Sequence, residues 1–299
     1  MKVLVTGASG LLGRALMLEL RTWSGCEAIG TAFSRIHDGL VSLNLLDEEA
    51  VLNCVRDVQP DVVIHSAAER RPDVSERDPA GTVALNLGAT ETIVRSAKEV
   101  GAWILFTSTN YVFDGSSPPY SPDSETHPLN LYGESKVNAE RALWRESDDS
   151  IVLRLPTLYG PVESLSECSV TTIADQIRKG EREFDHWATR FPTYVSDVAK
   201  VCIQILSFRI GHSGFCGTYH WSSDEALTKY EMARVMSVFL GADSDQLNPV
   251  LDPPPGALRP KNCQLDCSDL LELGIGNRTP FEVGISEALD SHRGILRAS

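Results

Sequence analysis

The sequence has 299 residues, of which 42% are hydrophobic and 23% charged, a composition typical of a packed α/β protein with one large domain or a domain and a smaller lobe. Its net charge of −14 argues against a protein that binds duplex nucleic acid or an anionic membrane, because both need clustered Lys and Arg. The seven Cys are scattered without a C-x-x-C pair, so neither a disulfide framework nor a metal site is predicted.

The chain reaches a glycine loop after a few residues, too early for the apolar core of a signal peptide, and no apolar run approaches membrane-spanning length. We therefore expect a soluble, cytoplasmic protein.

Strand and helix patterns alternate through the first half of the chain. Apolar runs predict strands at 2–6, 27–33, 60–68, 102–108 and 150–156. Segments between them predict helices at 11–20, 47–58, 80–100 and 131–144, the second with Asp47 as its N-cap. Strands separated by helices of this length predict an α/β fold, a Rossmann-type doubly wound parallel sheet with helices on both faces.

After about residue 156 the pattern changes. Residues 192–222 hold further strand and helix patterns of the sheet domain, whereas Pro-rich loops and short helices fill the rest. We predict a nucleotide-binding domain at 1–160 with returning segments at about 192–222. A smaller C-terminal substrate or partner lobe, residues 161–191 and 223–299, then lies over the C-terminal ends of the strands, where ligands of such sheets bind.

The stretch TGASGLLG, residues 6–13, places three glycines in G-x-x-G-x-x-G spacing between the first strand and the first helix. Glycines there permit a tight turn, and the helix N-terminus faces an anion with free N–H groups, which predicts a dinucleotide site. A turn that merely uses glycine is the alternative. The candidate contacts are Gly7, Gly10 and Gly13.

The end of the second strand reads TAFSRIH, residues 31–37, and lacks the acidic residue that binds the ribose hydroxyls of NAD. Ser34 and Arg35 stand there instead, and the Arg35 guanidinium suits a 2′-phosphate. We therefore predict NADP rather than NAD, with a solvated surface Arg as the alternative.

Three further segments are candidates for cofactor contacts. Asn44 and Leu45 lie where an adenine pocket is expected, and Ser66 follows the third predicted strand. Arg70 can reach the pyrophosphate. Alternatively, Arg70 and Arg71 pair with the neighbouring acids Glu69, Asp73 or Glu76.

Tyr132 and Lys136 are four residues apart on one predicted helix, so one face carries both. An ammonium near a phenol lowers its pKa, and such a Tyr can give a proton to the oxygen of a carbonyl that accepts hydride. Thr109, expected just past a strand, can donate a hydrogen bond to the same oxygen. Thr109, Tyr132 and Lys136 are the candidate catalytic residues, and Tyr132 and Lys136 are also candidates for cofactor binding. A packed aromatic ring and a solvated helical charge are the alternatives.

Together, TGASGLLG, TSTNYVFDG and YGESK resemble the extended short-chain dehydrogenase/reductases, and YVFDG with PLNLYG resembles the dTDP-4-dehydrorhamnose reductase group. This resemblance implies NADPH-dependent reduction of a ketone by the Thr and the Tyr-Lys pair. The group carries Asp after its Thr, where this chain has Asn110.

Longer stretches, among them HSAAERRPDV, DHWATRFPTYVSDVA and LDCSDLLELGIGNRTPF, resemble the β regulatory subunits of methionine adenosyltransferase. That resemblance implies bound NADP and a methionine adenosyltransferase catalytic subunit as partner. The implied NADP contacts are Gly10, Leu11, Leu12, Gly13, Phe33, Ser34, Arg35, Asn44, Leu45, Ser66, Arg70, Tyr132 and Leu158.

Two hypotheses follow. The first, which we favour, is an NADPH-dependent reductase of a ketone or related C=X group in a nucleotide sugar or specialised metabolite. In it His186, Trp187 and Arg190 line the substrate side, or else pack within the lobe. The second is a non-catalytic NADP-binding regulatory subunit. The last residues, LDSHRGILRAS, lack the aromatic side chains of that family's partner-binding tail, and aromatic anchors usually carry interface energy.

Overall fold

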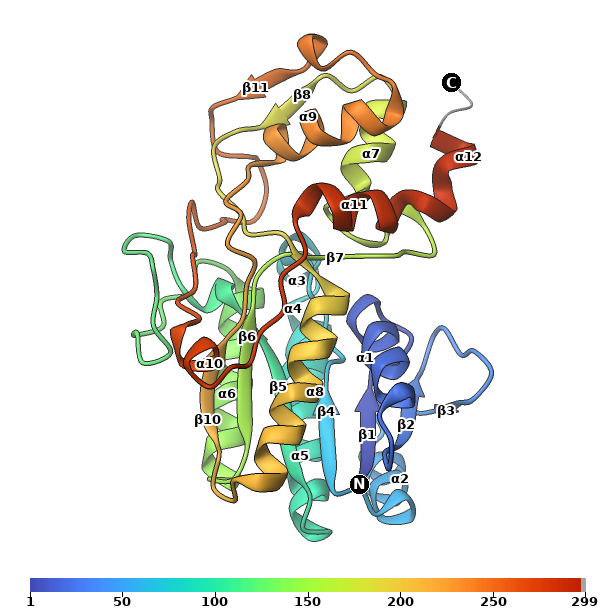
Figure 1. The fold of residues 1–299 in the computed structure, drawn as a ribbon. Helices are drawn as coiled ribbons and strands as arrows, with labels where there is room; N and C mark the ends of the chain where they lie inside the picture. The colour runs from blue at the N-terminus through green and yellow to red at the C-terminus, as the bar shows by residue number, and fades with distance from the viewer. Residues whose placement is uncertain (297–299) are drawn as a thin grey trace.

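The computed structural model describes residues 1–296, so residues 297–299 of the predicted lobe lie outside the described residues. Seven parallel strands form one sheet in the order β10-β6-β5-β4-β1-β2-β3 (Figure 1). This confirms the predicted Rossmann-type fold. The strands are β1 (Lys2–Thr6), β2 (Glu27–Ala32), β3 (Leu40–Ser42), β4 (Val62–His65), β5 (Trp103–Thr109), β6 (Ile151–Leu155) and β10 (Gly217–His220).

Helices cover both faces of the sheet (Figure 1). One face carries α1 (Leu11–Thr22) and α8 (Val195–Gly211), which pack on each other. The other carries α2 (Glu48–Val58), α5 (Ala89–Glu99) and α6 (Leu131–Glu146). The predicted N-cap of α2 is confirmed, because the Asp47 carboxylate accepts a hydrogen bond from the Ala50 N–H at 3.0 Å.

In the first half of the chain, the structure differs from the predicted elements most clearly at three places. The short strand β3 and the one-and-a-half-turn helix α3 (Pro72–Arg77) were not predicted. The predicted helix at 80–100 consists of α4 (Pro79–Val83), a π-helical segment η1 (Ala84–Gly88) and α5. Short or mostly exposed segments bury too few side chains to leave a periodic pattern in the sequence.

A second group of elements lies above the carboxyl ends of the strands (Figure 1). In this upper lobe β8 (Glu183–Asp185) pairs in parallel with β11 (Asn248–Val250), beside α7 (Thr171–Arg178), α9 (Lys229–Leu240), α11 (Phe281–Leu289) and α12 (Arg293–Leu296). A small pair, β7 (Leu158–Tyr159) and β9 (Thr193–Tyr194), connects the two parts, and α10 (Ser268–Glu272) packs near β10. The division into domains at 1–160 with about 192–222, and 161–191 with 223–299, stays a proposal.

The core alternates between the two faces of the sheet. In β1, Val3 and Val5 point to the side of α1 and α8, whereas Leu4 points to the side of α2 and α5, and all three are fully buried. Burial of such a side chain contributes about 1.5–3 kcal/mol, so the strand ends above this core are held firmly.

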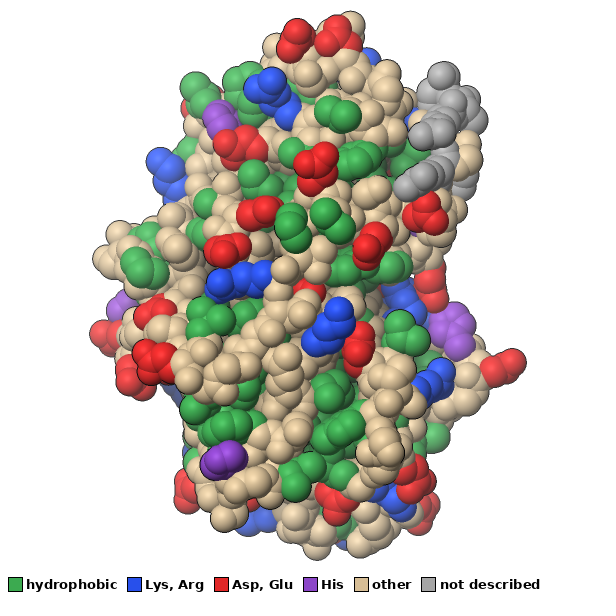
Figure 2. Space-filling view, viewed as in Figure 1, with side chains coloured by type: hydrophobic (Ala, Val, Ile, Leu, Met, Phe, Trp, Pro, Cys, Tyr) green, Lys and Arg blue, Asp and Glu red, His purple; other side chains and the backbone are tan. Residues whose placement is uncertain are grey.

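The outer surface is acidic, as the net charge requires, and Figure 2 shows Asp and Glu side chains over both the sheet domain and the upper lobe. Within residues 1–296, no helix has the length and hydrophobicity to span a bilayer. In the same part of the chain, no group of three or more His, Cys, Asp or Glu residues is placed to hold a metal ion.

Candidate active site and cofactor cavity

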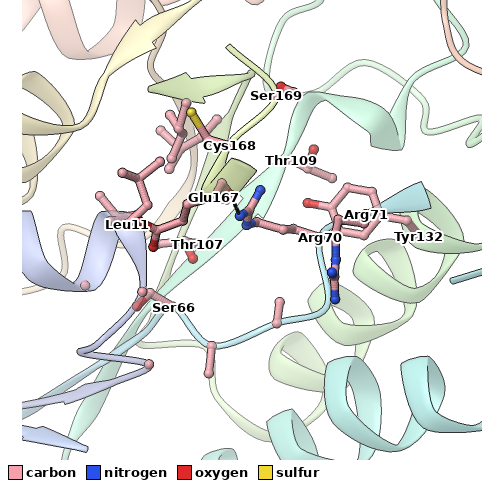
Figure 3. Close-up of a pocket in the computed structure, with 18 of the residues that line it drawn as sticks. Leu11, Ser66, Arg70, Arg71, Thr107, Thr109, Tyr132, Glu167, Cys168 and Ser169 are labelled. Atoms are coloured by element: carbon pink, nitrogen blue, oxygen red, sulfur yellow. Dashed lines mark hydrogen bonds between the residues drawn. The ribbon is translucent and has the colours of Figure 1, made fainter. Parts of the chain in front are cut away.

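A cavity of about 760 Å³ opens where the carboxyl ends of the strands meet the upper lobe (Figure 3). It lies at the point of the sheet where the strand order reverses, between β1 and β4, which is the usual ligand position in this architecture. The structure brings together every residue predicted as catalytic or cofactor-binding, although their roles stay predictions. These residues are Gly7, Gly10, Leu11, Leu12, Gly13, Phe33, Ser34, Arg35, Asn44, Leu45, Ser66, Arg70, Thr109, Tyr132, Lys136 and Leu158.

The glycine loop requires glycine for steric reasons. Gly7 has φ +70°, and a Cβ there would lie 2.9 Å from the Cα of Ala67. A Cβ on Gly13 would lie only 2.1 Å from the carbonyl oxygen of Gly7. These close approaches let the loop turn directly into α1, so the glycines are more than a convenient turn.

The N-terminus of α1 faces this cavity. Gly10 is the N-cap, and no side chain of residues 1–296 caps the first turn of the helix. The first N–H groups and the positive end of the helix dipole therefore remain available to a phosphate.

Arg35 follows β2 and lines the cavity, with a side chain that is 42% exposed and ion-paired. Its Nη1 donates to Glu163 Oε2 at 3.0 Å and to Glu167 Oε1 at 2.9 Å. The hydrogen bond to Glu167 is the main reason why the pKa of Arg35 is raised. Arg35 is thus a charged, positioned donor at the edge of the cavity.

The two arginines after β4 behave differently from each other. The Arg71 guanidinium pairs with the Glu69 carboxylate, with Nη2 to Oε2 at 2.6 Å, as the alternative reading predicted. Arg70 instead reaches across the cavity and donates to the carbonyl oxygen of Glu167 (Figure 3). Arg70 therefore keeps a position from which it can contact a bound anion.

Ser66 directly follows β4 and contacts the end of the neighbouring strand β1. Its hydroxyl donates to the carbonyl oxygen of Thr6 at 2.7 Å, so it fixes the end of β4 against the end of β1. Its role in the structure is thus partly to shape the cavity floor.

The candidate catalytic residues come from β5 and α6. Thr109 is the last residue of β5 rather than a residue beyond it. Asn130 caps α6 by accepting the Gly133 N–H at 2.9 Å, and Tyr132 and Lys136 then lie one turn apart. Figure 3 shows Thr109 beside the ring of Tyr132.

The expected lowering of the Tyr132 pKa is wrong, because the pKa is raised. Burial raises the pKa of Tyr132 to about 12, and the hydrogen bond to Thr109 opposes that only in part. Lys136 does not offset it, because its Nζ donates to the Thr107 carbonyl oxygen at 2.7 Å and lies 3.9 Å from the centre of the Phe106 ring. Burial also lowers the pKa of Lys136 to about 7.

Asn110 lines the cavity, but its side-chain amide is bound to another segment of the chain. Its Nδ2 donates to the Cys263 carbonyl oxygen at 3.1 Å, and the residue is only 7% exposed. The amide therefore ties the end of β5 to a late segment of the chain, a bond that an ionised carboxylate cannot make.

Of the three residues predicted for the substrate side, only Arg190 lines the cavity. Its guanidinium is paired with Asp185 through Nη2 and Oδ2 at 2.6 Å. His186 packs within the lobe, with Nδ1 2.9 Å from the Thr228 hydroxyl and its ring against Tyr230, and neither it nor Trp187 lines the cavity.

The comparisons with known proteins agree with this geometry. The family model described as the RmlD substrate binding domain matches residues 1–293. The chain belongs to the RmlD family. It is 47% identical over 291 residues to methionine adenosyltransferase 2 subunit beta of Xenopus tropicalis, covering 96% of this chain and 87% of that protein.

More distant relatives include named reductases. The chain is 29% identical over 244 residues to dTDP-4-dehydrorhamnose reductase of Aggregatibacter actinomycetemcomitans, covering 78% of this chain and 76% of that protein. A crystal structure of a dTDP-4-dehydrorhamnose reductase from Clostridium acetobutylicum superposes with a TM-score of 0.84 at 26% identity, covering 98% of this chain and all of that one. Both predicted resemblances of this RmlD-family chain are confirmed.

Sequence reasoning missed several residues of this RmlD-family cavity. Glu167 is the most consequential, because it contacts three arginines, and Tyr111, Lys229 and Arg259 also line the cavity. No motif marks Glu167, which lies 132 residues from Arg35. Of these missed residues, Tyr111 lies in a quoted motif, because it begins the stretch YVFDG.

Proposed function

We propose that this cavity binds NADP, with the pyrophosphate at the glycine loop and the 2′-phosphate at Arg35. The observation that carries the proposal is the convergence of candidate residues from Gly7 to Leu158 on one cavity. The uncapped first turn of α1 supplies N–H donors for the pyrophosphate, and Arg70 lies close enough to assist. The steric need for glycine at positions 7 and 13 supports the same reading.

The site best supports the reduction of a ketone or related C=X group. When bound, NADPH would supply hydride to the carbon of this group. The Tyr132 hydroxyl gives its proton to the oxygen, and the product is an alcohol. A pKa of about 12 keeps Tyr132 protonated at neutral pH, as an acid requires. Thr109 donates a hydrogen bond to the same oxygen, and Lys136 holds the backbone of β5 in place through Thr107.

The test is NADPH consumption, followed by its absorbance, with a panel of ketones that includes nucleotide-linked 4-keto sugars. Tyr132→Phe should lower turnover by about 10²- to 10⁴-fold, the range of general acid catalysis, and leave NADPH binding intact. Tyr111→Phe is the matched control, since its ring lies 6.2 Å from that of Tyr132 and lines the same cavity. Tight NADPH binding without turnover of any ketone would reject the reductase.

A second candidate function is that of a regulatory subunit of methionine adenosyltransferase. The 47% identity to subunit beta over 96% of the chain, against 29% to the reductase over 78%, favours it. In this case a methionine adenosyltransferase catalytic subunit should co-elute with the purified chain, and its rate of S-adenosylmethionine synthesis should change. Absence of both effects would remove this candidate.

A further inference from the structure

Two carboxylates from the segment before α7 lie against the arginines at the edge of the cofactor cavity. Glu163 and Glu167 share Arg35, with oxygen-to-Nη1 distances of 3.0 Å and 2.9 Å. Arg14 of α1 contacts the same pair, at 2.8 Å to Glu167 and 3.8 Å to Glu163. Arg35 follows β2 while the two glutamates come from the far side of the cavity, so this cluster bridges the two parts of the molecule.

The two glutamates are held very differently. The Glu167 side chain is 7% exposed, receives two hydrogen bonds of 2.8 Å from Arg14 and accepts the Glu163 N–H at 3.0 Å. The Glu163 side chain is 38% exposed, and its contacts are Arg35, His37 at 3.0 Å and the longer one to Arg14. Glu167 is therefore held in place by the surrounding structure. Glu163 is held by fewer contacts and acts on its surroundings mainly through its negative charge.

The charges of this cluster nearly cancel. The guanidinium groups of Arg14 and Arg35 face the carboxylates of Glu163 and Glu167, whereas Arg70 contacts only the backbone carbonyl oxygen of Glu167. Arg35 therefore offers a bound phosphate little uncompensated positive charge. Both carboxylates use Nη1 of Arg35, and Nη2 and Nε have no partner within residues 1–296. Nη2 and Nε of Arg35 can thus still donate to a phosphate. The negative charge of Glu163, which is bound to Nη1 of the same guanidinium, then repels that phosphate.

We propose that Glu163 is a specificity-determining residue that weakens the preference of the cavity for NADP over NAD. This inference rests on the proposed NADP site. The 2′-phosphate of NADP carries nearly two negative charges at neutral pH, as other phosphate monoesters do, and NAD lacks this group. Glu163 therefore opposes the binding of one dinucleotide and leaves the other unaffected.

The experiment compares dissociation constants of NADP and NAD for the wild-type chain and Glu163→Gln, measured by calorimetry at fixed ionic strength. Because exposed charge pairs are worth up to about 1 kcal/mol, NADP should bind up to about fivefold more tightly to the variant. NAD should bind equally to both. Glu163→Ala should give the same change, which excludes an effect of the new amide.

Glu272→Gln is the control for total charge, because it removes one carboxylate from the exposed surface of α10. It should leave the ratio of the two constants unchanged. If Glu163 instead orients Arg35 for the phosphate, the variant loses NADP affinity, and that result or an unchanged ratio overturns the inference. Failure of the wild-type chain to bind either dinucleotide overturns the NADP site itself, and this inference with it.

Discussion

At Asn110 a single atom, the amide nitrogen, gives the residue a structural role. The resemblance to the reductase group implies Asp at this position, yet the amide here donates to the Cys263 carbonyl oxygen at 3.1 Å. Cys263 itself donates from Sγ to the Phe113 carbonyl oxygen, so the two segments are joined twice. The amide nitrogen is the part of Asn110 that a carboxylate cannot replace.

Asn110→Asp should therefore destabilise the chain. An ionised carboxylate facing a carbonyl oxygen in a buried position should lower the free energy of unfolding by about 1–3 kcal/mol. Urea denaturation at pH 8 measures this. At pH 5 the difference from wild type should shrink, because a protonated Asp can donate the missing hydrogen bond, and an equal loss at both pH values would contradict this explanation.

At the scale of elements, the glycine loop and α1 form one unit with almost no free space. Gly13→Ala would place its Cβ 2.1 Å from the Gly7 carbonyl oxygen, so the helix or the loop must move. We expect a loss of about 1–3 kcal/mol in the free energy of unfolding, as for other overpacked sites, and weaker NADP binding. Thermal or urea unfolding together with calorimetry provides both readings.

Gly88→Ala is the control for that substitution. Gly88 has helical φ and ψ of −59° and −45°, and a Cβ there would meet no atom within 4 Å. Replacement of such a helical glycine should raise the free energy of unfolding by about 0.5–1 kcal/mol. Equal losses for both variants would mean that the crowding at Gly13 is not the cause.

The elements also show what a single sequence can reveal. The buried strands and α1, α2 and α6 follow from apolar runs, the glycine triplet and the Asp47 cap, because each of these signals is local. Strand β3 has three residues with little burial, and its pairing with β2 depends on the rest of the sheet. Likewise, the contact of Glu167 with Arg35 and the raised pKa of Tyr132 follow from packing between distant segments, which no local pattern records.

At the scale of the whole molecule, the C-terminal segment is tied back onto the sheet domain. Buried Asp197 of α8 accepts the Thr279 N–H at 2.6 Å and the Thr279 hydroxyl at 2.8 Å, and it also accepts from the side chain of Asn277. Tyr194 donates to Glu287 at 2.9 Å. These bonds tie α11 and the segment before it to α8 and β9, so the folding of the upper lobe is coupled to that of the sheet domain.

Two buried histidines make the stability of the whole molecule sensitive to acid. His65 lies between Thr6, with Nδ1 2.7 Å from its hydroxyl, and Thr90, and burial lowers its pKa to about 3. Burial, with a smaller effect of Arg154, likewise lowers the pKa of His220 to about 3. The ordinary pKa is 6.5, so below that pH the unfolded chain binds a proton at each position that the folded chain does not.

The free energy of unfolding should therefore fall as the pH drops through 6.5, by about 2 kcal/mol per histidine between pH 8 and pH 5. Urea denaturation across this range measures the total, and His65→Gln should make the loss smaller by one histidine's share. His127→Gln, at a position whose side chain is 57% exposed, should leave the loss as in wild type. An equally steep loss in His65→Gln would show that buried His65 takes up its proton in the folded chain, and that the sheet domain tolerates a charge between β1 and α5.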